Sequence, residues 1–363
     1  MLTPNQRIAQ NNDAKKNFSL SFPLSLYFHA GVDSIILDYL SYGLKLKKEY
    51  CTLKAFTLFN DKNILPNILA RHILWAKDPS LIESFLHNNI HLLDYYVEAT
   101  DPAGRKRKRT LYQHALAAGD IEMVKKIKNV FVQNKKISEE EKQRKEQFPQ
   151  GWEKVVLERL VEDMLALDNV INFIVAAKSK VIQELKLECE ESINIFKNYF
   201  TKYNEMPSIG FDFDMQFLQF VVQRLAENTH ESDFLWGEKG EKSDLYCTEI
   251  LAFTQSLVSA RDAQCIVYGL SFIVDDYNKL LIKEEKNVPR NLILDNGKHY
   301  YKAFKEKQKG SSRFVTLKGE HTWMMTRRSM IQKTAEVMQN YVNRKNKNFE
   351  ELGLNYQSLL LKS

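Results

Sequence analysis

The stretch Thr110-Leu-Tyr-Gln-His-Ala-Leu-Ala-Ala-Gly119-Asp-Ile-Glu-Met-Val-Lys-Lys-Ile127 decides the fold, because it predicts a helix, a tight turn and a second helix. Thr110 and Gln113 have the spacing of a capping box at the start of the first helix. Gly119 supplies the left-handed backbone conformation that commonly ends a helix. Three apolar residues then recur at helical spacing and give the second helix one apolar face: Met123, Val124 and Ile127. The stretch is therefore typical of a helical hairpin.

Two upstream segments fit the same frame. Gly31 occupies the position of Gly119 in the first of them, and Lys77 occupies it in the second. In all three copies the positions four, five and eight residues later are apolar or aromatic: Ile35, Ile36, Tyr39, Leu81, Ile82, Phe85, Met123, Val124 and Ile127. A single hairpin cannot bury its apolar side, so we expect the three copies to stack on one another.

Two other interpretations of this region stay open. Helix pairs in a plain helical bundle could share this phase by chance. The alternation of apolar residues between Phe18 and Phe28 also fits an amphipathic strand, which Pro23 would confine to a sheet edge. Because proline is well tolerated at the first position of a helix, we favour a helix there.

The three copies resemble the ankyrin repeat, whose first helix opens with T-P-L-H-x-A and ends at a glycine. The Pro-Leu pair at 23–24 matches the opening in the first copy, and Thr110 and Ala115 match it in the third. Lys77 departs from the glycine in the middle copy, and the copies are spaced more widely than single repeats. The resemblance implies that residues 18–132 form a protein-binding stack without catalytic machinery, which binds through its concave face and its loops.

Five consecutive cations precede the third copy: Arg105, Lys106, Arg107, Lys108 and Arg109. In an ankyrin-like stack they would fall in the loop that projects as a finger. Such a loop could be a nuclear import signal, contact phosphorylated lipid headgroups, or simply be solvated. At about 1 kcal/mol for each cation near an anionic surface, five contribute at most about 5 kcal/mol, too little to anchor the chain alone. No aromatic residues are interleaved, so nucleic acid is the least favoured partner.

The rest of the chain predicts further helices. Residues 133–150 are rich in Lys, Glu, Gln and Arg, and we expect an exposed helix or a mobile linker there. Residues 151–348 predict an α-helical domain, and short tails occupy 1–17 and 349–363. Helical spacing of apolar residues marks five segments: 155–177, 185–200, 215–225, 250–274 and 326–343. The predicted fold class is therefore mainly α, with one weak strand candidate at 313–317.

The catalytic candidates are few. Cys265 or Cys247 could form a thiol–imidazole pair with His321, but Cys265 lies on an apolar helix face where a buried, inert thiol is more usual. Asp212-Phe-Asp214 has the D-x-D form of a metal-binding motif, although Asp214 is better explained as the N-cap of the next helix. No nucleotide-binding, zinc-protease or nucleophile-elbow motif occurs. We therefore expect no cofactor and no metal, and a binding protein rather than an enzyme.

The composition agrees with a helical protein that works by binding. Thirteen glycines and eight prolines are few for 363 residues, which favours helices with short connections. The four cysteines lie far apart, which excludes a local zinc knuckle and a small disulfide scaffold. No apolar run reaches the roughly 18 residues of a membrane span, so we expect no transmembrane segment. The net charge of +6 permits an acidic partner without requiring one.

Over its whole length the chain resembles the ankyrin-bearing effectors that intracellular bacteria deliver into host cells through a type IV secretion system. The segments that carry this resemblance are Ala117–Asp120, Phe148–Trp152, Arg261–Leu270, Glu350–Glu351 and Ser358–Ser363. The last two resemble the acidic patch and the hydrophobic end of an export signal. The resemblance implies a virulence-associated interaction protein that binds a host protein in the host cytoplasm or nucleus. The alternatives are a thiol-dependent enzyme acting on the captured partner, and targeting to an anionic surface through the five cations.

Overall fold

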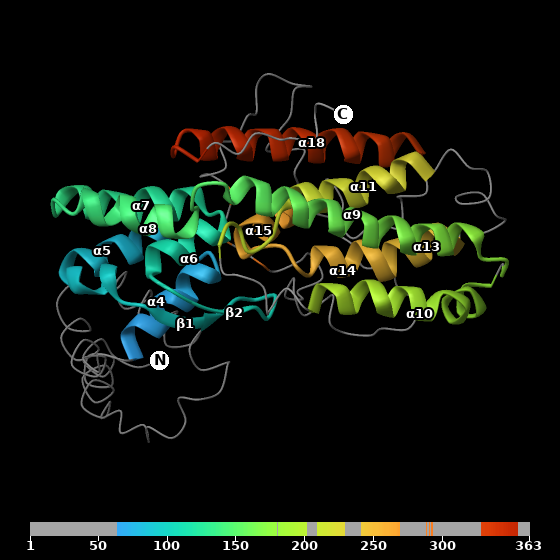
Figure 1. The fold of residues 1–363 in the computed structure, drawn as a ribbon, viewed down its shortest axis with the longest axis horizontal. Helices are drawn as coiled ribbons and strands as arrows, with labels where there is room; N and C mark the ends of the chain where they lie inside the picture. The colour runs from blue at the N-terminus through green and yellow to red at the C-terminus, as the bar shows by residue number, and fades with distance from the viewer. Residues whose placement is uncertain are drawn as a thin grey trace, which may run out of the picture. The chain divides into compact units, whose positions relative to one another are not determined.

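The computed structural model describes residues 64–179, 181–201, 209–228, 241–268 and 328–354, together with Val288, Arg290 and Leu292. All of these except the first two residues belong to one compact unit, Pro66–Ser363. Several expected features lie outside the described residues: the first hairpin copy, the strand alternative at 18–28, the strand candidate at 313–317, His321 and the terminal segment 358–363. The mainly helical class is confirmed (Figure 1).

The described residues form helices with short connections and a two-stranded sheet. The N-terminal elements are α4 (Ile64–Leu74), α5 (Pro79–Asn88), the 3-10 helix η2 (Ile90–Asp94), β1 (Val97–Thr100), β2 (Lys106–Arg109), α6 (Leu111–Ala118), α7 (Ile121–Gln133) and α8 (Ile137–Gln147). They are followed by α9 (Trp152–Ala176), α10 (Ile182–Thr201), α11 (Met215–Asn228), α13 (Glu241–Tyr246), the π-helix η4 (Cys247–Leu251), α14 (Ala252–Gln255), α15 (Ala260–Tyr268) and α18 (Arg328–Glu350). Within these ranges, no helix combines the length and the apolar character that crossing a membrane requires.

The hairpin of α6 and α7 forms as its sequence predicts. Thr110 caps α6 by accepting a hydrogen bond from the Gln113 backbone N–H, and the Gln113 side chain accepts one from the Thr110 N–H. Gly119 ends α6 in the left-handed conformation, with φ 66°. Asp120 then caps α7 by accepting a hydrogen bond from the Met123 N–H. The three apolar residues expected on α7 are fully buried: Met123, Val124 and Ile127.

The middle copy forms a second hairpin, with one difference from the expected frame. Asp78 caps α5 as Asp120 caps α7, which keeps the second helices in phase. The left-handed residue is Ala76, with φ 49°, rather than Lys77, the position aligned with Gly119. One of the three apolar residues expected on α5 is fully buried and the other two are half-buried: Ile82, Leu81 and Phe85. Both α5 and α6 pack against α7, so the two hairpins share a core.

The segment expected to be an exposed helix or a mobile linker contains the helix α8, which exposes much of its surface but packs one side against the protein. The buried side chains of α8 are polar: Glu140, Gln143 and Gln147. Thr110 Oγ1 donates to Gln143 Oε1 over 2.7 Å, and Gln143 Nε2 donates to the Leu93 carbonyl over 2.9 Å. The Tyr112 hydroxyl donates to Glu140. Because these buried groups have partners, a helix with few apolar residues can pack against α6.

The helices from α9 onward enclose the larger apolar core. In this part α9 packs against α10 and α11, and α11 packs against α18 (Figure 1). Four of the expected helices are present, the last of them longer than predicted: 155–177, 185–200, 215–225 and 326–343. The single helix expected at 250–274 is instead interrupted between Gln255, where α14 ends, and Ala260, where α15 begins, and its last six positions lie outside the described residues. The Ser259 hydroxyl donates to the Asp262 carboxylate over 2.7 Å and accepts from the Asp262 N–H, which caps α15.

The junction at Phe148–Trp152 is part of a cluster of aromatic rings. Phe148 lies 4.8 Å from Trp152 and 5.0 Å from Phe211, measured between ring centroids. Phe349 of α18 lies 4.4 Å from Phe211. The segment where the sequence pattern changes therefore connects α8 to α9 through a shared core.

Candidate functional site

The basic segment before α6, expected in a finger loop, belongs to a β-hairpin whose second strand is Lys106–Arg109. The Gly104 N–H donates to the Asp101 carbonyl over 3.0 Å, and the Arg105 N–H donates to the Asp101 carboxylate over 2.8 Å. Asp101, Pro102 and Gly104 are the residues that a type I turn favours at its first, second and fourth positions. Gly104 has φ 98°, a conformation that a residue with a Cβ rarely adopts.

The strand β2 sends its arginines and its lysines to opposite faces. Arg109 is buried, as is Arg105 just before the strand, and Arg107 is half-buried. Lys106 and Lys108 are exposed. Arginine suits the inner face because its planar guanidinium makes several hydrogen bonds and is weakly hydrated, whereas the strongly hydrated lysine ammonium stays in water. Of the five cations, Lys106 and Lys108 are therefore the two that are exposed to a partner.

The buried arginines have two carboxylate partners, Asp212 for Arg109 and Asp101 for Arg105. Arg109 Nη1 lies 2.7 Å from Asp212 Oδ1. Arg105 Nε lies 2.6 Å from Asp101 Oδ2, and Arg105 Nη1 donates to the carbonyls of two other residues, each over 2.8 Å: Asp212 and Leu257. Burial alone would raise the pKa of Asp212, but the charges of Arg109 and Arg105 outweigh it and hold that pKa below its ordinary value. The hairpin is thereby fixed to the segment that precedes α11.

The solvent face of the hairpin carries two lysines and one glutamate. Lys106 Nζ lies 2.6 Å from Glu98 Oε1, and both side chains are more than half exposed. The register places Glu98 opposite Lys108 and Thr100 opposite Lys106. An ion pair at this exposure contributes at most about 1 kcal/mol, so Lys106 can exchange Glu98 for a carboxylate of a partner. We take this face as the candidate binding site.

Asp212 and Asp214 have separate structural roles. Asp214 Oδ1 accepts a hydrogen bond from the Gln216 N–H over 2.9 Å and so caps α11, as its sequence position predicts. Asp212 is paired with Arg109. The described residues contain no group of three or more His, Cys, Asp or Glu side chains that could hold a metal ion.

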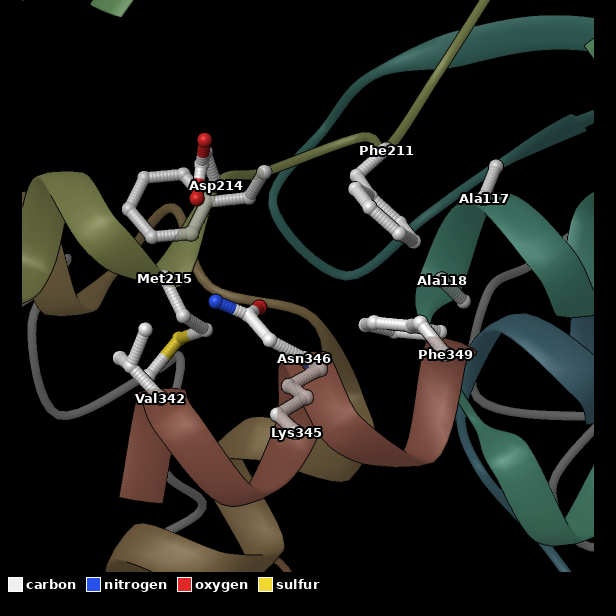
Figure 2. A pocket seen from close by; sticks show the side chains of 11 residues that line it. Ala117, Ala118, Phe211, Asp214, Met215, Val342, Lys345, Asn346 and Phe349 are labelled. Atoms are coloured by element: carbon white, nitrogen blue, oxygen red, sulfur yellow. The ribbon is translucent and has the colours of Figure 1, made fainter. Parts of the chain in front are cut away.

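A small hollow lies between the α6–α7 turn, the segment before α11 and the helix α18 (Figure 2). Its wall is mainly apolar: Phe211, Phe213, Met215, Val342 and Phe349. Asn346 points from α18 into the hollow, between Met215 and Phe349, and its buried Nδ2 has no hydrogen-bond partner within the described chain. The enclosed space is about the size of a water molecule, which is too small for a substrate or a cofactor.

Cys247 and Cys265 are buried in the helical core and are not placed as reactive thiols. Burial, with the charge of Asp244 nearby, raises the pKa of the Cys247 thiol to about 12. A nucleophilic cysteine needs the opposite, namely a lowered pKa and access to solvent. His321, their expected partner, lies outside the described residues.

Sequence reasoning missed Asp101 and Asp212, the two carboxylates that hold the hairpin. The turn sequence from Asp101 to Gly104 and the strict alternation of Arg and Lys over 105–109 are signals for a hairpin, because a period of two is typical of a strand. Asp212 lies 103 positions after Arg109, so no local pattern identifies it as the counter-ion.

No family model matches this sequence, and neither a curated protein nor a solved structure matches it.

Proposed function

We propose that this chain is a non-enzymatic interaction protein that binds a partner protein through its ankyrin-like N-terminal part. The observation that carries the proposal is the β1–β2 hairpin, which lies in the chain between two helical hairpins and exposes two lysines on one face. Because Lys106 and Lys108 form this face, the surface of the partner is acidic.

The ankyrin-like character has support from two features besides the hairpin. The two successive helical hairpins have aspartate caps at equivalent positions, Asp78 on α5 and Asp120 on α7. The second helices, α5 and α7, pack against each other. A β-hairpin then connects one helix pair to the next, where an ankyrin stack would carry its finger.

Buried contacts hold the β1–β2 hairpin in place before a partner binds. Arg105 and Arg109 anchor it with charge-assisted hydrogen bonds in a buried setting. A partner therefore meets Lys106 and Lys108 on a backbone that is already ordered, and less conformational freedom is lost on binding.

We further propose that the partner is a host protein, and that the chain reaches it through a type IV secretion system and acts in the host cytoplasm or nucleus. The support is the resemblance of Glu350–Glu351 and Ser358–Ser363 to an export signal. A translocation reporter fused to the full chain should give a signal in host cells infected with a secretion-competent strain. Equal signals from a secretion-deficient strain would contradict this route.

Site-specific photo-cross-linking in host cells tests the contact face. A photoreactive amino acid in place of Thr100, which lies opposite Lys106, keeps both lysines and is expected to trap one protein. The control carries the same photoreactive residue in place of Lys142, an exposed position on α8 away from the hairpin face. Equal trapping at both positions, or none at position 100, would contradict the proposal.

Contact with an anionic surface or an import receptor is the second candidate, because Lys106 and Lys108 face solvent together. At about 1 kcal/mol each, they contribute about 2 kcal/mol, well below the sum for five exposed cations. Vesicles of anionic phospholipid test the lipid version. Salt-sensitive binding that disappears in K106E/K108E would favour a lipid surface over a protein partner.

A further inference from the structure

The outward side of α9 and α10 exposes large apolar side chains. Leu165 and Phe173 on α9 are each 59% exposed, and Ile195 on α10 is 64% exposed. Single exposed apolar residues are common on proteins, but several along one pair of packed helices mark an interaction surface.

One of the α9 residues, Phe173, borders the line along which the two helices meet. Tyr199 of α10 donates its hydroxyl hydrogen to Glu162 of α9 over 3.4 Å, so Glu162 lies on the side of α9 that faces α10. In a helix of 3.6 residues per turn, Leu165 and Phe173 lie within about 60° of Glu162. Phe173 therefore stands beside α10, whereas Leu165 stands on the outward side of α9, because it lies equally about 60° from Asp168, which pairs with Arg224 of α11.

The α10 residue borders the same line from the other side. Glu188 of α10 accepts a hydrogen bond over 3.0 Å from the N–H of Lys178, which follows the end of α9, so Glu188 faces α9. Ile195 lies about 20° from Glu188 around the helix. Phe173 and Ile195 thus border the line between the helices, and together with Leu165 on the outward side of α9 they form one exposed surface, which we call the α9–α10 seam.

The α9–α10 seam is acidic, although the chain as a whole is basic. The two helices carry nine acidic and four basic residues, whereas the whole chain has a net charge of +6. The exposed glutamates beside the apolar residues are Glu158, Glu162, Glu184, Glu188 and Glu191. Backbone hydrogen bonds from Lys178 and Ser179 hold the pKa of Glu188 below its ordinary value.

We propose that the α9–α10 seam docks an amphipathic helix with cationic flanks, contributed by a partner protein. Apolar residues of that helix at positions i, i+4 and i+7 would cover Leu165, Phe173 and Ile195, while lysines and arginines on its flanks would meet the glutamates. At 1.5 Å per residue, the 25 residues of α9 and the 20 of α10 give a seam of about 30 Å, enough for a helix of about 18 residues.

Charge favours this occupant over two others. A second copy of the chain that set its own seam against this one would oppose glutamates to glutamates. An anionic membrane would repel the same side chains. A cationic helix instead satisfies both the apolar strip and its acidic border.

A designed peptide measures the docking. The probe is a fluorescent peptide of about 18 residues, with leucines in one helical stripe and lysines elsewhere; the reference peptide has the same composition with its leucines spread around the helix. Fluorescence anisotropy with the full chain is expected to show saturable binding of the probe and at least about tenfold weaker binding of the reference. The variant L165Q/I195Q, which leaves the net charge unchanged, is expected to bind the probe peptide at least about tenfold more weakly.

The control is Leu187→Gln, which removes an equally large side chain that is 71% exposed and lies about 100° from Glu188 around α10. Equal binding of the two peptides, or equal weakening by L187Q and L165Q/I195Q, would overturn the proposal. Sedimentation tests the second copy. If the wild-type chain is a dimer and L165Q/I195Q is a monomer, the seam binds a second copy, and the proposal is overturned. These variants leave Lys106 and Lys108 in place, so failure here is distinct from failure of the proposed function.

Discussion

Arg290 and Asp120 form a bidentate ion pair that joins the two helical hairpins of the N-terminal part. Arg290 Nη1 lies 2.7 Å from Asp120 Oδ2, and Arg290 Nη2 donates to Asp120 Oδ1 over 3.0 Å. The same guanidinium donates to the carbonyls of Ala76 and Lys77, each over 3.0 Å, where α4 turns toward α5. One residue far along the chain therefore holds the turns of both hairpins.

Replacing Arg290 with methionine should lower the free energy of unfolding by about 3–5 kcal/mol, because the Asp120 carboxylate would stay buried without its counter-ion. The Asp120 side chain is only 1% exposed, so water cannot replace the guanidinium. Chemical denaturation followed by circular dichroism measures the loss.

Two variants separate this effect from a general loss of packing. R290M/D120N should be more stable than R290M, because asparagine still caps α7 and no buried charge remains. Lys154→Met removes an exposed ion pair with Glu158 and should change stability by less than about 1 kcal/mol. A loss in R290M no larger than that in K154M would contradict the role given to Arg290.

Exchanges that conserve charge test the two faces of β2. Arg109→Lys should lower the free energy of unfolding by about 2 kcal/mol, because an ammonium cannot reproduce the buried guanidinium contacts with Asp212. Lys108→Arg should stay within about 0.5 kcal/mol of wild type, because position 108 faces solvent. Chemical denaturation of both variants measures the two changes. Equal losses in free energy of unfolding would show that the two faces of β2 do not differ in burial.

His72 and His114 should make the protein less stable in acid. Burial lowers the pKa of each imidazole to about 4 from an ordinary value of 6.5. The native state therefore binds fewer protons than the unfolded state between these values, and stability is lost as the pH falls from 6.5 toward 4. Protonation of each histidine in the unfolded state should lower the free energy of unfolding by about 3 kcal/mol across that pH interval.

His72→Leu isolates one of the two contributions. In the described part of the chain neither ring nitrogen of His72 has a hydrogen-bond partner, so leucine leaves no polar group unsatisfied. Urea titrations at about pH 7 and about pH 4.5 should show a smaller acid loss in H72L than in wild type, by about 2–3 kcal/mol. The same loss in both proteins would show that His72 is not protonated on unfolding.

Cys247 and Cys265 should resist alkylation by iodoacetamide in the native chain and react after unfolding in urea, because both thiols are buried. Mass spectrometry of the labelled peptides gives the rate at each position. A cysteine placed at the exposed position of Lys142 should react in both states. Native labelling of Cys247 as fast as that of the cysteine at 142 would contradict its burial.

Local signals predicted the α6–α7 hairpin well, because each acts over a few residues. The Thr110–Gln113 box, Gly119 and the apolar face of α7 all form as expected. The Arg–Lys alternation over 105–109 is just as local and indicates a strand, yet five consecutive cations also suggest an exposed loop. The arginines turn inward because Asp101 pairs with Arg105 and the distant Asp212 pairs with Arg109.

The packing of α8 and the turn at Ala76 could not be predicted from local sequence. The composition of α8 predicts an exposed helix. Its buried side is held by hydrogen bonds between Gln143 and two groups from elements earlier in the chain, the Thr110 hydroxyl and the Leu93 carbonyl. Ala76 adopts a left-handed conformation that alanine usually avoids, and Gln264 and Arg290 both donate to its carbonyl. In each case the deciding partner is brought close by tertiary structure.

The affinity of the full chain for its cross-linked partner tests the proposed binding face most directly. Isothermal titration calorimetry at physiological salt should show binding at least about tenfold weaker for K106E/K108E, a loss of about 1.4 kcal/mol. The control K142E/K154E makes the same change of charge at two exposed lysines and should stay within about twofold of wild type. If K106E/K108E binds as tightly as wild type, or if both variants weaken binding equally, the β1–β2 hairpin is not the binding face.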